Sequence, residues 1–323
     1  MQEKLKYYRT LADEFLNSSV SLTKIAEREG TSRQTLAKYF KQLGVEIVNK
    51  QNKLKFDNTV FDSIDTEEKA YWLGFIFADG TISSSPLETG KKPKYTMELS
   101  LKADDFHHLE KFNTFMKYEK NGVKIQDVKC GKVICKRCRW IITDKHLWET
   151  LNSYGCTPRK SLILKFPDEN IFKSKDLIRH FIRGYFDGDG CFSQIVHHII
   201  VSPLVSFLGT KEFLDKISEY SQIKSSYRHD RRHTEFTWIL AYHKESGIKL
   251  INYLYNNCTI FLDRKYKLYE FFRNGSRSVQ EWTELSSSKI GGSPIEGNTE
   301  VIEETKESST PYSIENEPIK QFS

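Results

Sequence analysis

Two short apolar stretches that end in Asp-Gly constrain this chain more than any other feature. Residues 71–80 read YWLGFIFADG, and residues 182–190 read IRGYFDGDG. Each stretch fits an apolar helix with a glycine near its middle, and the last aspartates of the two stretches lie 110 positions apart. The sequence therefore predicts an internal duplication, in which two related units each begin with such a helix.

The ends of the first helix carry their own signals. Asp65 followed by Glu68 fits a capping box at the start of the helix. Gly80 fits a left-handed stop at its end. One apolar helix of this kind is usually only structural, whereas two copies with matching Gly and Asp positions favour a shared site.

The central glycines predict how the two helices pack. Because glycine has no side chain, backbones approach closely at Gly74 and Gly184, and this contact brings Asp79 and Asp189 together at one end of the seam. The carbonyl end of a helix is already electronegative, so two carboxylates placed there favour a bound cation. Oxygen ligands of this kind suit Mg²⁺, or Mn²⁺ in its place.

Residues 58–273 resemble the LAGLIDADG homing endonucleases, whose motif is a helix of this type. In that family the acidic residue before the last glycine binds the metal, which implies this role for Asp79 and Asp189. The first acidic position of the motif, which is not normally required for catalysis, is Phe77 in one copy and Asp187 in the other. The resemblance implies a monomer that cuts both strands of a long asymmetric DNA site across the minor groove, leaving short 3′ overhangs.

The chain divides into five predicted segments: a small all-α helix-turn-helix domain (1–46), a linker (47–58), two repeats (59–165 and 166–273) and an acidic tail (274–323). Each repeat is expected to run helix, two strands, helix, two strands, helix. The fold class is therefore α+β, a pseudo-dimer of two αββαββα repeats whose antiparallel sheets form a basic saddle.

Alternating and helical apolar patterns locate the expected elements. In the first repeat they predict strands at 95–101, 123–129 and 133–143, with helices at 104–116 and 145–154. In the second they predict strands at 191–194, 201–209, 225–231 and 235–242, with helices at 211–220 and 246–255.

The first 46 residues have the pattern of a DNA-binding helix-turn-helix. An apolar helical stripe around Ile25 breaks at Gly30 and resumes around Leu36. Residues near the start of the second helix are expected to face the major groove and phosphates: Arg33, Gln34, Thr35 and Lys38. A helical hairpin used for protein contacts is the alternative.

Charge is unevenly distributed and favours a polyanionic partner. The net charge is +6, but the tail from residue 274 carries −5, which leaves +11 on the rest of the chain. Basic side chains on strands of both repeats are the expected contacts to double-stranded DNA: Lys136, Arg137, Arg139, Arg228, Arg231 and Arg232.

A second duplicated signature follows the last helix of each repeat, where Cys-Thr stands shortly before Arg-Lys. In the family a basic residue in this region lies beside each metal site, which implies this place for Lys160 and Lys265. Such a lysine stabilises charge on the scissile phosphate or polarises the attacking water. A phosphate clamp and a solvated lysine are the alternatives.

Two further functions fit the same features: a non-cleaving DNA-binding regulator and a maturase that binds intron RNA. The presence of both Asp79 and Asp189 disfavours the regulator, whereas a maturase can keep both. No apolar run approaches the ~20 residues of a membrane span, and the N-terminus has no signal-peptide core. These features predict a protein of the cytoplasm, associated with the nucleoid, or of an organelle.

Two segments carry weaker signals. Cys130, Cys135 and Cys138 have a spacing that zinc could use, but a β-hairpin around Gly131 is the favoured interpretation. The tail is rich in Ser, Gly and Pro and is expected to be mostly disordered.

Overall fold

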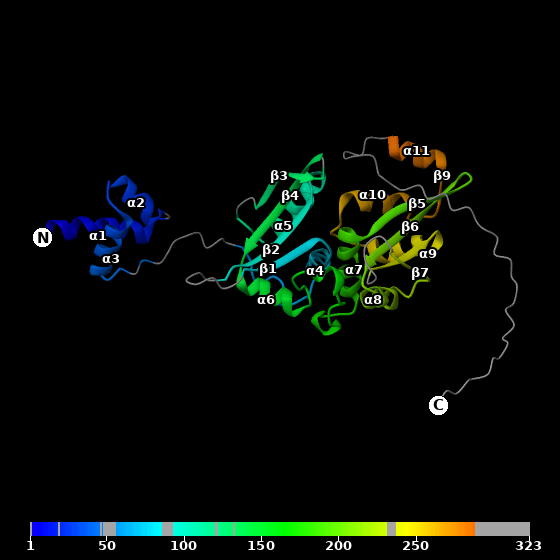
Figure 1. The fold of residues 1–323 in the computed structure, drawn as a ribbon, viewed down its shortest axis with the longest axis horizontal. Coiled ribbons are helices and arrows are strands. Elements are labelled where there is room, and N and C mark those ends of the chain that lie inside the picture. The colour runs from blue at the N-terminus through cyan, green and yellow to red at the C-terminus, as the bar shows by residue number, and fades with distance from the viewer. Residues whose placement is uncertain are drawn as a thin grey trace, which may run out of the picture. The chain divides into compact units, whose positions relative to one another are not determined.

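The computed structural model describes residues 2–18, 20–45, 47, 56–85, 93–119, 122–131, 133–230 and 237–287 (Figure 1). The chain divides into two compact units, one of residues 1–58 and 111–122 and the other of residues 59–110 and 123–323. Among the described helices, none is long and apolar enough to span a membrane.

Three helices begin the first unit: α1 (Gln2–Asn17), α2 (Leu22–Arg28) and α3 (Arg33–Gln42). Serine side chains cap two of them, because Ser21 accepts from the Lys24 N–H and Ser32 from the Thr35 N–H. Gly30 has a φ of +61° in the turn between α2 and α3, a backbone conformation that favours glycine.

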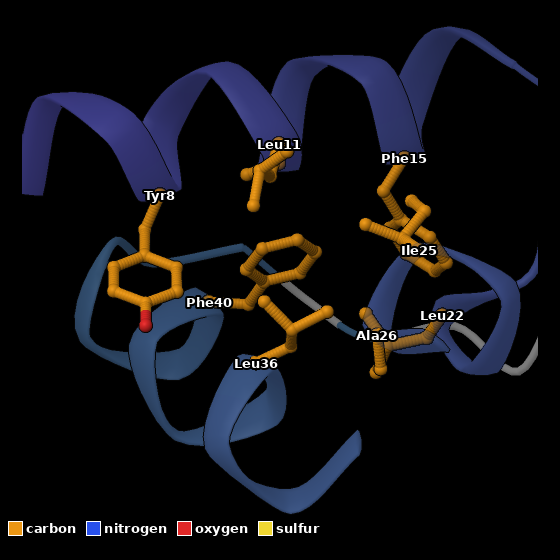
Figure 2. Close-up of a cluster of buried hydrophobic side chains, with 9 residues drawn as sticks. Tyr8, Leu11, Phe15, Leu22, Ile25, Ala26, Leu36 and Phe40 are labelled. Atoms are coloured by element: carbon orange, nitrogen blue, oxygen red, sulfur yellow. The ribbon is translucent and has the colours of Figure 1, made fainter. Parts of the chain in front are cut away.

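The core of these three helices is a cluster of buried side chains from all of them (Figure 2). It contains Tyr8, Leu11, Ala12, Phe15, Leu22, Ile25, Ala26, Leu36 and Phe40. The sequence pattern predicts α2 and α3 but leaves α1 unassigned. Helix α1 contributes four residues to the cluster and so covers the apolar faces of the other two helices.

The end of the predicted linker is tied to a distant part of the chain. The Asp57 N–H donates to the Met116 carbonyl at 2.8 Å, and the Asp57 carboxylate pairs with Lys117 at 2.9 Å. Residues 56–58 therefore belong to a compact unit with residues 111–122, while residues 48–55 of the linker lie outside the described residues.

The two repeats have the same order of elements, which confirms the predicted α+β class and duplication. The first consists of α4 (Glu67–Asp79), β1 (Gly80–Ser84), β2 (Tyr95–Lys102), α5 (Phe106–Phe115), β3 (Val123–Cys130), β4 (Val133–Thr143) and α6 (Lys145–Ser153). The second consists of α7 (Asp176–Asp189), β5 (Cys191–His197), β6 (Ile200–Gly209), α8 (Lys211–Ser221), β7 (Ser226–His229), β8 (Trp238–His243) and α9 (Glu245–Tyr255). The expected order includes a strand directly after α4, to which the sequence analysis gives no residue range, and β1 is that strand.

Both sheets are antiparallel and have matching strand orders, β1-β2-β4-β3 and β5-β6-β8-β7. Their inner faces are apolar: Met97, Leu99 and Leu101 are buried along β2, and Leu99 lies opposite Trp140 of β4. Helices α4 and α7 lie between the two sheets (Figure 1).

The crossing of α4 and α7 depends on one glycine from each helix. A Cβ atom on Gly74 would lie 1.9 Å from the Phe181 carbonyl oxygen, and one on Gly184 would lie 1.9 Å from the Tyr71 carbonyl oxygen. Both distances are far inside van der Waals contact with backbone atoms, so larger residues would force the helices apart.

A buried arginine also joins the two repeats. Arg183 is 0 % exposed and donates to the Ile260 and Leu254 carbonyls, each at 3.1 Å. It also donates to the Glu67 carboxylate at 2.7 Å, and that carboxylate accepts a bond from the Thr259 N–H at 2.7 Å. The start of α4 is thereby fixed to the second repeat.

The ends of α4 differ from the sequence prediction. The N-cap is Thr66, which accepts from the Lys69 N–H, while Asp65 pairs with the Lys69 ammonium group at 2.9 Å. Gly80 has an extended φ of −76°, so it is not a left-handed stop. Glycine is required there because a Cβ atom would lie 2.5 Å from the Ile76 carbonyl oxygen.

The ordered chain continues past the predicted boundary at residue 274. After α10 (Asp263–Phe272), strand β9 (Arg277–Ser278) pairs with β6, and α11 (Val279–Ser287) follows. Trp282 stacks on Phe272 with ring centroids 5.9 Å apart. Residues 277–287 of the tail, which is expected to be mostly disordered, therefore form β9 and α11, and residues 288–323 lie outside the described part of the chain.

Candidate active site

The carbonyl ends of α4 and α7 lie together and carry Asp79 and Asp189. A Cβ atom on Gly188 would lie 2.4 Å from the Ala78 Cβ and 3.3 Å from Asp79 Oδ2, which places the last turns of the two helices in contact. Asp79 is half-buried, and Asp189 is the more exposed of the two.

Both carboxyl groups are harder to ionise than in water. Withdrawal from water and, to a smaller extent, the negative charge of Asp189 together raise the pKa of Asp79 to about 6. Withdrawal from water also raises the pKa of Asp189. Two neighbouring carboxyl groups with raised pKa values favour the binding of a cation, which would stabilise their ionised forms.

Two buried lysines supply part of that charge. Lys160 donates to the Gly80 carbonyl, and Lys265 donates to the Phe186 carbonyl and, at 2.6 Å, to the Gly190 carbonyl. Lys160 is 9 % exposed and Lys265 is 3 % exposed. Each ammonium group therefore caps the carbonyl end of one motif helix.

The lysines also act on the carboxyl groups. The positive charges of Lys160 and Lys265 both lower the pKa of each aspartate, opposing the effect of burial. Burial and the neighbouring charge of Arg264 together lower the pKa of Lys265 to about 8. The result is a compact cluster of two carboxyl and two ammonium groups, one of each from each repeat.

Three residues near this cluster are not predicted as site residues by the sequence. Burial raises the pKa of Tyr185, the charges of Asp189 and Asp79 add to the rise, and its hydroxyl donates to the Leu208 carbonyl at 2.8 Å. The Arg264 Nε lies 3.3 Å from both carboxylate oxygens of Asp105. The Arg264 charge also lowers the pKa of Asp79. The duplicated Arg-Lys pair was the only sequence signal for any of them.

The predicted basic strand residues do not all share one face. Arg139 and Arg137 of β4 lie opposite Ser100 and Lys102 of β2, on the sheet face away from the core. Arg139 also pairs with the Glu98 carboxylate at 2.5 Å. Lys136 lies on the opposite face of the β3–β4 ribbon, across from Asp127. The structure therefore separates Lys136 from the two arginines.

In the second sheet Arg228 is exposed on β7, whereas Arg231 and Arg232 lie outside the described residues. In the first unit, Arg33, Gln34 and Lys38 are exposed on α3. Thr35 is half-buried, and its hydroxyl lies 2.8 Å from that of Ser32, so it takes part in the helix cap.

The cysteines of the first sheet fall on a β-hairpin. Gly131 has a φ of +62° between β3 and β4, as the hairpin interpretation expects. Cys138 is buried and donates to the Lys102 carbonyl at 3.1 Å. Cys135, three positions earlier on β4, points to the opposite face, so these two thiols cannot share a metal ion. The side chain of Cys130 is not among those described.

Several solved structures are similar to this chain. Meganuclease I-SmaMI bound to uncleaveable DNA has a TM-score of 0.44 and 13% identity, over 64% of this chain and 89% of that one. The I-LtrWI LAGLIDADG homing endonuclease bound to target DNA gives 0.44 and 12%, over 65% and 91%. The LAGLIDADG homing endonuclease I-GzeII in complex with its DNA target gives 0.43 and 14%, over 69% and 92%.

No protein-family model matches the sequence, and no curated protein matches it.

Proposed function

We propose that this protein is a site-specific endonuclease that cuts both strands of double-stranded DNA in the presence of Mg²⁺ or Mn²⁺. The observation that carries the proposal is the meeting of Asp79 and Asp189 at the ends of two copies of one helix. Each repeat supplies one carboxylate and one buried lysine. This pseudo-twofold pairing suits a duplex, whose two strands run in opposite directions.

The residues present fit a divalent metal ion. The pKa of each aspartate is raised, and Mg²⁺ binds through one or two carboxylates together with water and phosphate oxygens. No group of three or more His, Cys, Asp or Glu side chains in the described part of the chain forms a metal site. Asp79 and Asp189 would be the side-chain ligands, and bound Mg²⁺ would supply Lewis acidity for hydrolysis.

The two buried lysines would stabilise the charge that develops on the scissile phosphates. Lys160 and Lys265 hold positive charge beside the carboxylates, where the scissile phosphates would gain negative charge during hydrolysis. Their bonds to the helix-end carbonyls fix the ammonium groups before DNA arrives. Pre-set charge of this kind needs no reorganisation when the phosphate reacts.

The DNA contacts are proposed for the outer faces of the two sheets and for α3. Arg137 lies on such a face with Lys102 beside it, and Arg33 and Lys38 lie on the exposed side of α3. The two repeats differ in sequence, so the target is asymmetric. One chain contains both carboxylates, which makes the monomer the working form, and the cut ends would be short 3′ overhangs.

The test is cleavage of a randomised library of linear duplex DNA by the purified full-length chain, with Mg²⁺ and with EDTA. The proposal expects double-strand breaks at one long site only when Mg²⁺ is present. Specific binding without any cutting in Mg²⁺ would contradict it and favour the DNA-binding regulator. A parallel assay with structured intron RNA tests the maturase.

A further inference from the structure

Asp187 is a buried carboxylate that the proposed chemistry does not use. It is 0 % exposed and lies on α7, two positions before Asp189. It accepts hydrogen bonds from the Tyr71 hydroxyl at 2.7 Å, the Tyr255 hydroxyl at 2.5 Å and the Leu262 N–H at 2.8 Å. A carboxylate in the interior is tolerated when donors satisfy it, and these donors come from three separate segments.

The third donor links Asp187 to the buried lysine of the second repeat. Leu262 is the N-cap residue of α10, and Lys265 lies in the first turn of that helix. The Lys265 ammonium group returns to α7 and donates to the Asp187 and Gly190 carbonyls, at 3.0 Å and 2.6 Å. The start of α10 is therefore held to α7 at two points, through the Leu262 N–H and through the lysine side chain.

The first repeat has no such anchor at the equivalent position. Phe77 replaces the aspartate, is fully buried, and packs against Phe181 with ring centroids 5.2 Å apart. Its ring accepts no bond from a backbone N–H. Lys160 lies on a single 3₁₀ turn and follows Arg159, whose φ is +58°. The backbone that carries Lys160 is therefore a 3₁₀ turn, whereas the backbone that carries Lys265 is an α-helix anchored by Asp187.

We propose that Asp187 is a positioning residue that holds Lys265 beside the aspartate pair, and that the two halves of the site therefore differ. Cutting of the strand served by Lys265 then depends on Asp187, whereas cutting of the strand served by Lys160 does not. The strand-specific part of this inference rests on the proposed endonuclease activity, but the anchoring of α10 does not.

Two substitutions at Asp187 separate anchoring from general stability. Asp187→Leu removes every acceptor, so the Leu262 N–H and the Tyr255 hydroxyl lose their partner, while the Tyr71 hydroxyl keeps only its contact with His108 Nε2 at 3.0 Å. Asp187→Asn keeps an oxygen that the Leu262 N–H can use. Tyr242→Phe is the control, because it removes a buried hydroxyl of the same repeat whose partner is the Ser221 hydroxyl at 3.1 Å.

The first measurement needs neither metal nor DNA. Hydrogen exchange of the peptide covering residues 258–266 is followed in EDTA for the wild type and the three variants. Asp187→Leu is expected to speed exchange roughly tenfold or more, because the buried N–H loses its partner. Asp187→Asn should stay within about threefold of the wild type, and Tyr242→Phe should match it. Equal exchange in the wild type and Asp187→Leu would overturn the anchoring.

The second measurement maps which strand stays uncut in a supercoiled plasmid that carries the target. Asp187→Leu should accumulate nicked circles with the same strand intact as in Lys265→Met, and the opposite strand from Lys160→Met. Equal slowing of both strands would contradict the positioning role. If the wild type makes no cut, the proposed activity fails, while the exchange result still decides whether Asp187 anchors α10.

A second variant covers the case in which Asp187→Leu does not fold. Leu262→Pro removes the N–H donor and leaves Asp187 in place, at a φ of −82° that proline tolerates. The same strand bias is expected, and an unbiased loss of cutting would count against the proposal.

Discussion

Replacing Asp79 with asparagine should stabilise the metal-free protein while weakening its stabilisation by Mg²⁺. The pKa of Asp79 rises from 3.8 to about 6 because its carboxylate is withdrawn from water beside Asp189. That rise corresponds to a cost of about 3 kcal/mol for holding the ionised group in the folded protein. Solvent on the outer side of this half-buried residue reduces the expected gain of Asp79→Asn to roughly 1–2 kcal/mol.

The sign of the pH dependence follows from proton binding. Between about pH 4 and pH 6 the folded state holds the Asp79 proton more tightly than the unfolded state does, so this group lowers stability as the pH rises through that window. Asparagine has no such proton. The advantage of Asp79→Asn should therefore be small near pH 4 and complete above about pH 7.

Urea unfolding followed by tryptophan fluorescence measures this effect in the full-length chain. All five tryptophans, at positions 72, 140, 148, 238 and 282, lie in the unit that contains the repeats, so the signal reports on that unit. Millimolar Mg²⁺ should raise the wild-type midpoint by binding the folded pair, and should raise that of Asp79→Asn much less. Glu270→Gln, an exposed site on α10, is the matched control.

Two results would refute this reasoning. One is a loss of stability on Asp79→Asn at pH 8 in EDTA, since the carboxylate would then be a net stabilising group. The other is a gain that stays constant from pH 4.5 to pH 8, since burial of an ionised carboxyl group could not produce it.

Three further predictions concern packing and DNA contacts. Gly74→Ala should destabilise the repeats by at least about 3 kcal/mol or prevent their folding, because its Cβ atom would overlap the backbone of α7. Gly30→Ala is the control: it lies in the first unit with open space around it, so the tryptophan transition should be unchanged. Arg183→Met should cost about 3 kcal/mol in the same urea assay, because buried carbonyls and Glu67 lose their donor; an unchanged midpoint would show that the bonds are not stabilising. Lys38→Ala should weaken DNA binding and lower the salt slope of the affinity by about one; an unaltered slope in fluorescence anisotropy titrations would remove Lys38 from the phosphate contacts.

The sequence predicted the elements whose signals are periodic. Alternation along residues 95–101 and 133–143 predicted two central strands, and duplication of the motif predicted that the two repeats share one topology. The same duplication pointed to Asp79 and Asp189. The predictions of elements and topology are confirmed, because apolar periodicity reports on burial, which the chain encodes locally; the role of the two aspartates stays a prediction.

Other features depend on contacts between distant segments, and local patterns do not encode those. Helix α1 is predominantly polar, so its sequence pattern did not predict it. Its apolar side chains in the core are buried only because they pack against α2 and α3. The sequence analysis explained Gly80 by a left-handed φ, which the structure does not have. Glycine is needed there because the nearby Ile76 carbonyl leaves no room for a side chain. The role of Asp187 could not be predicted from local patterns, because its donors lie 68 to 116 positions away along the chain.

The most direct test of the central claim is strand cleavage by Asp79→Asn and Asp189→Asn on the selected target, with binding measured in parallel. The account predicts that each variant binds the DNA as tightly as the wild type does in EDTA, and loses Mg²⁺-dependent double-strand cleavage. Full cleavage by either variant would show that the carboxylate pair at the helix ends is not the site of hydrolysis.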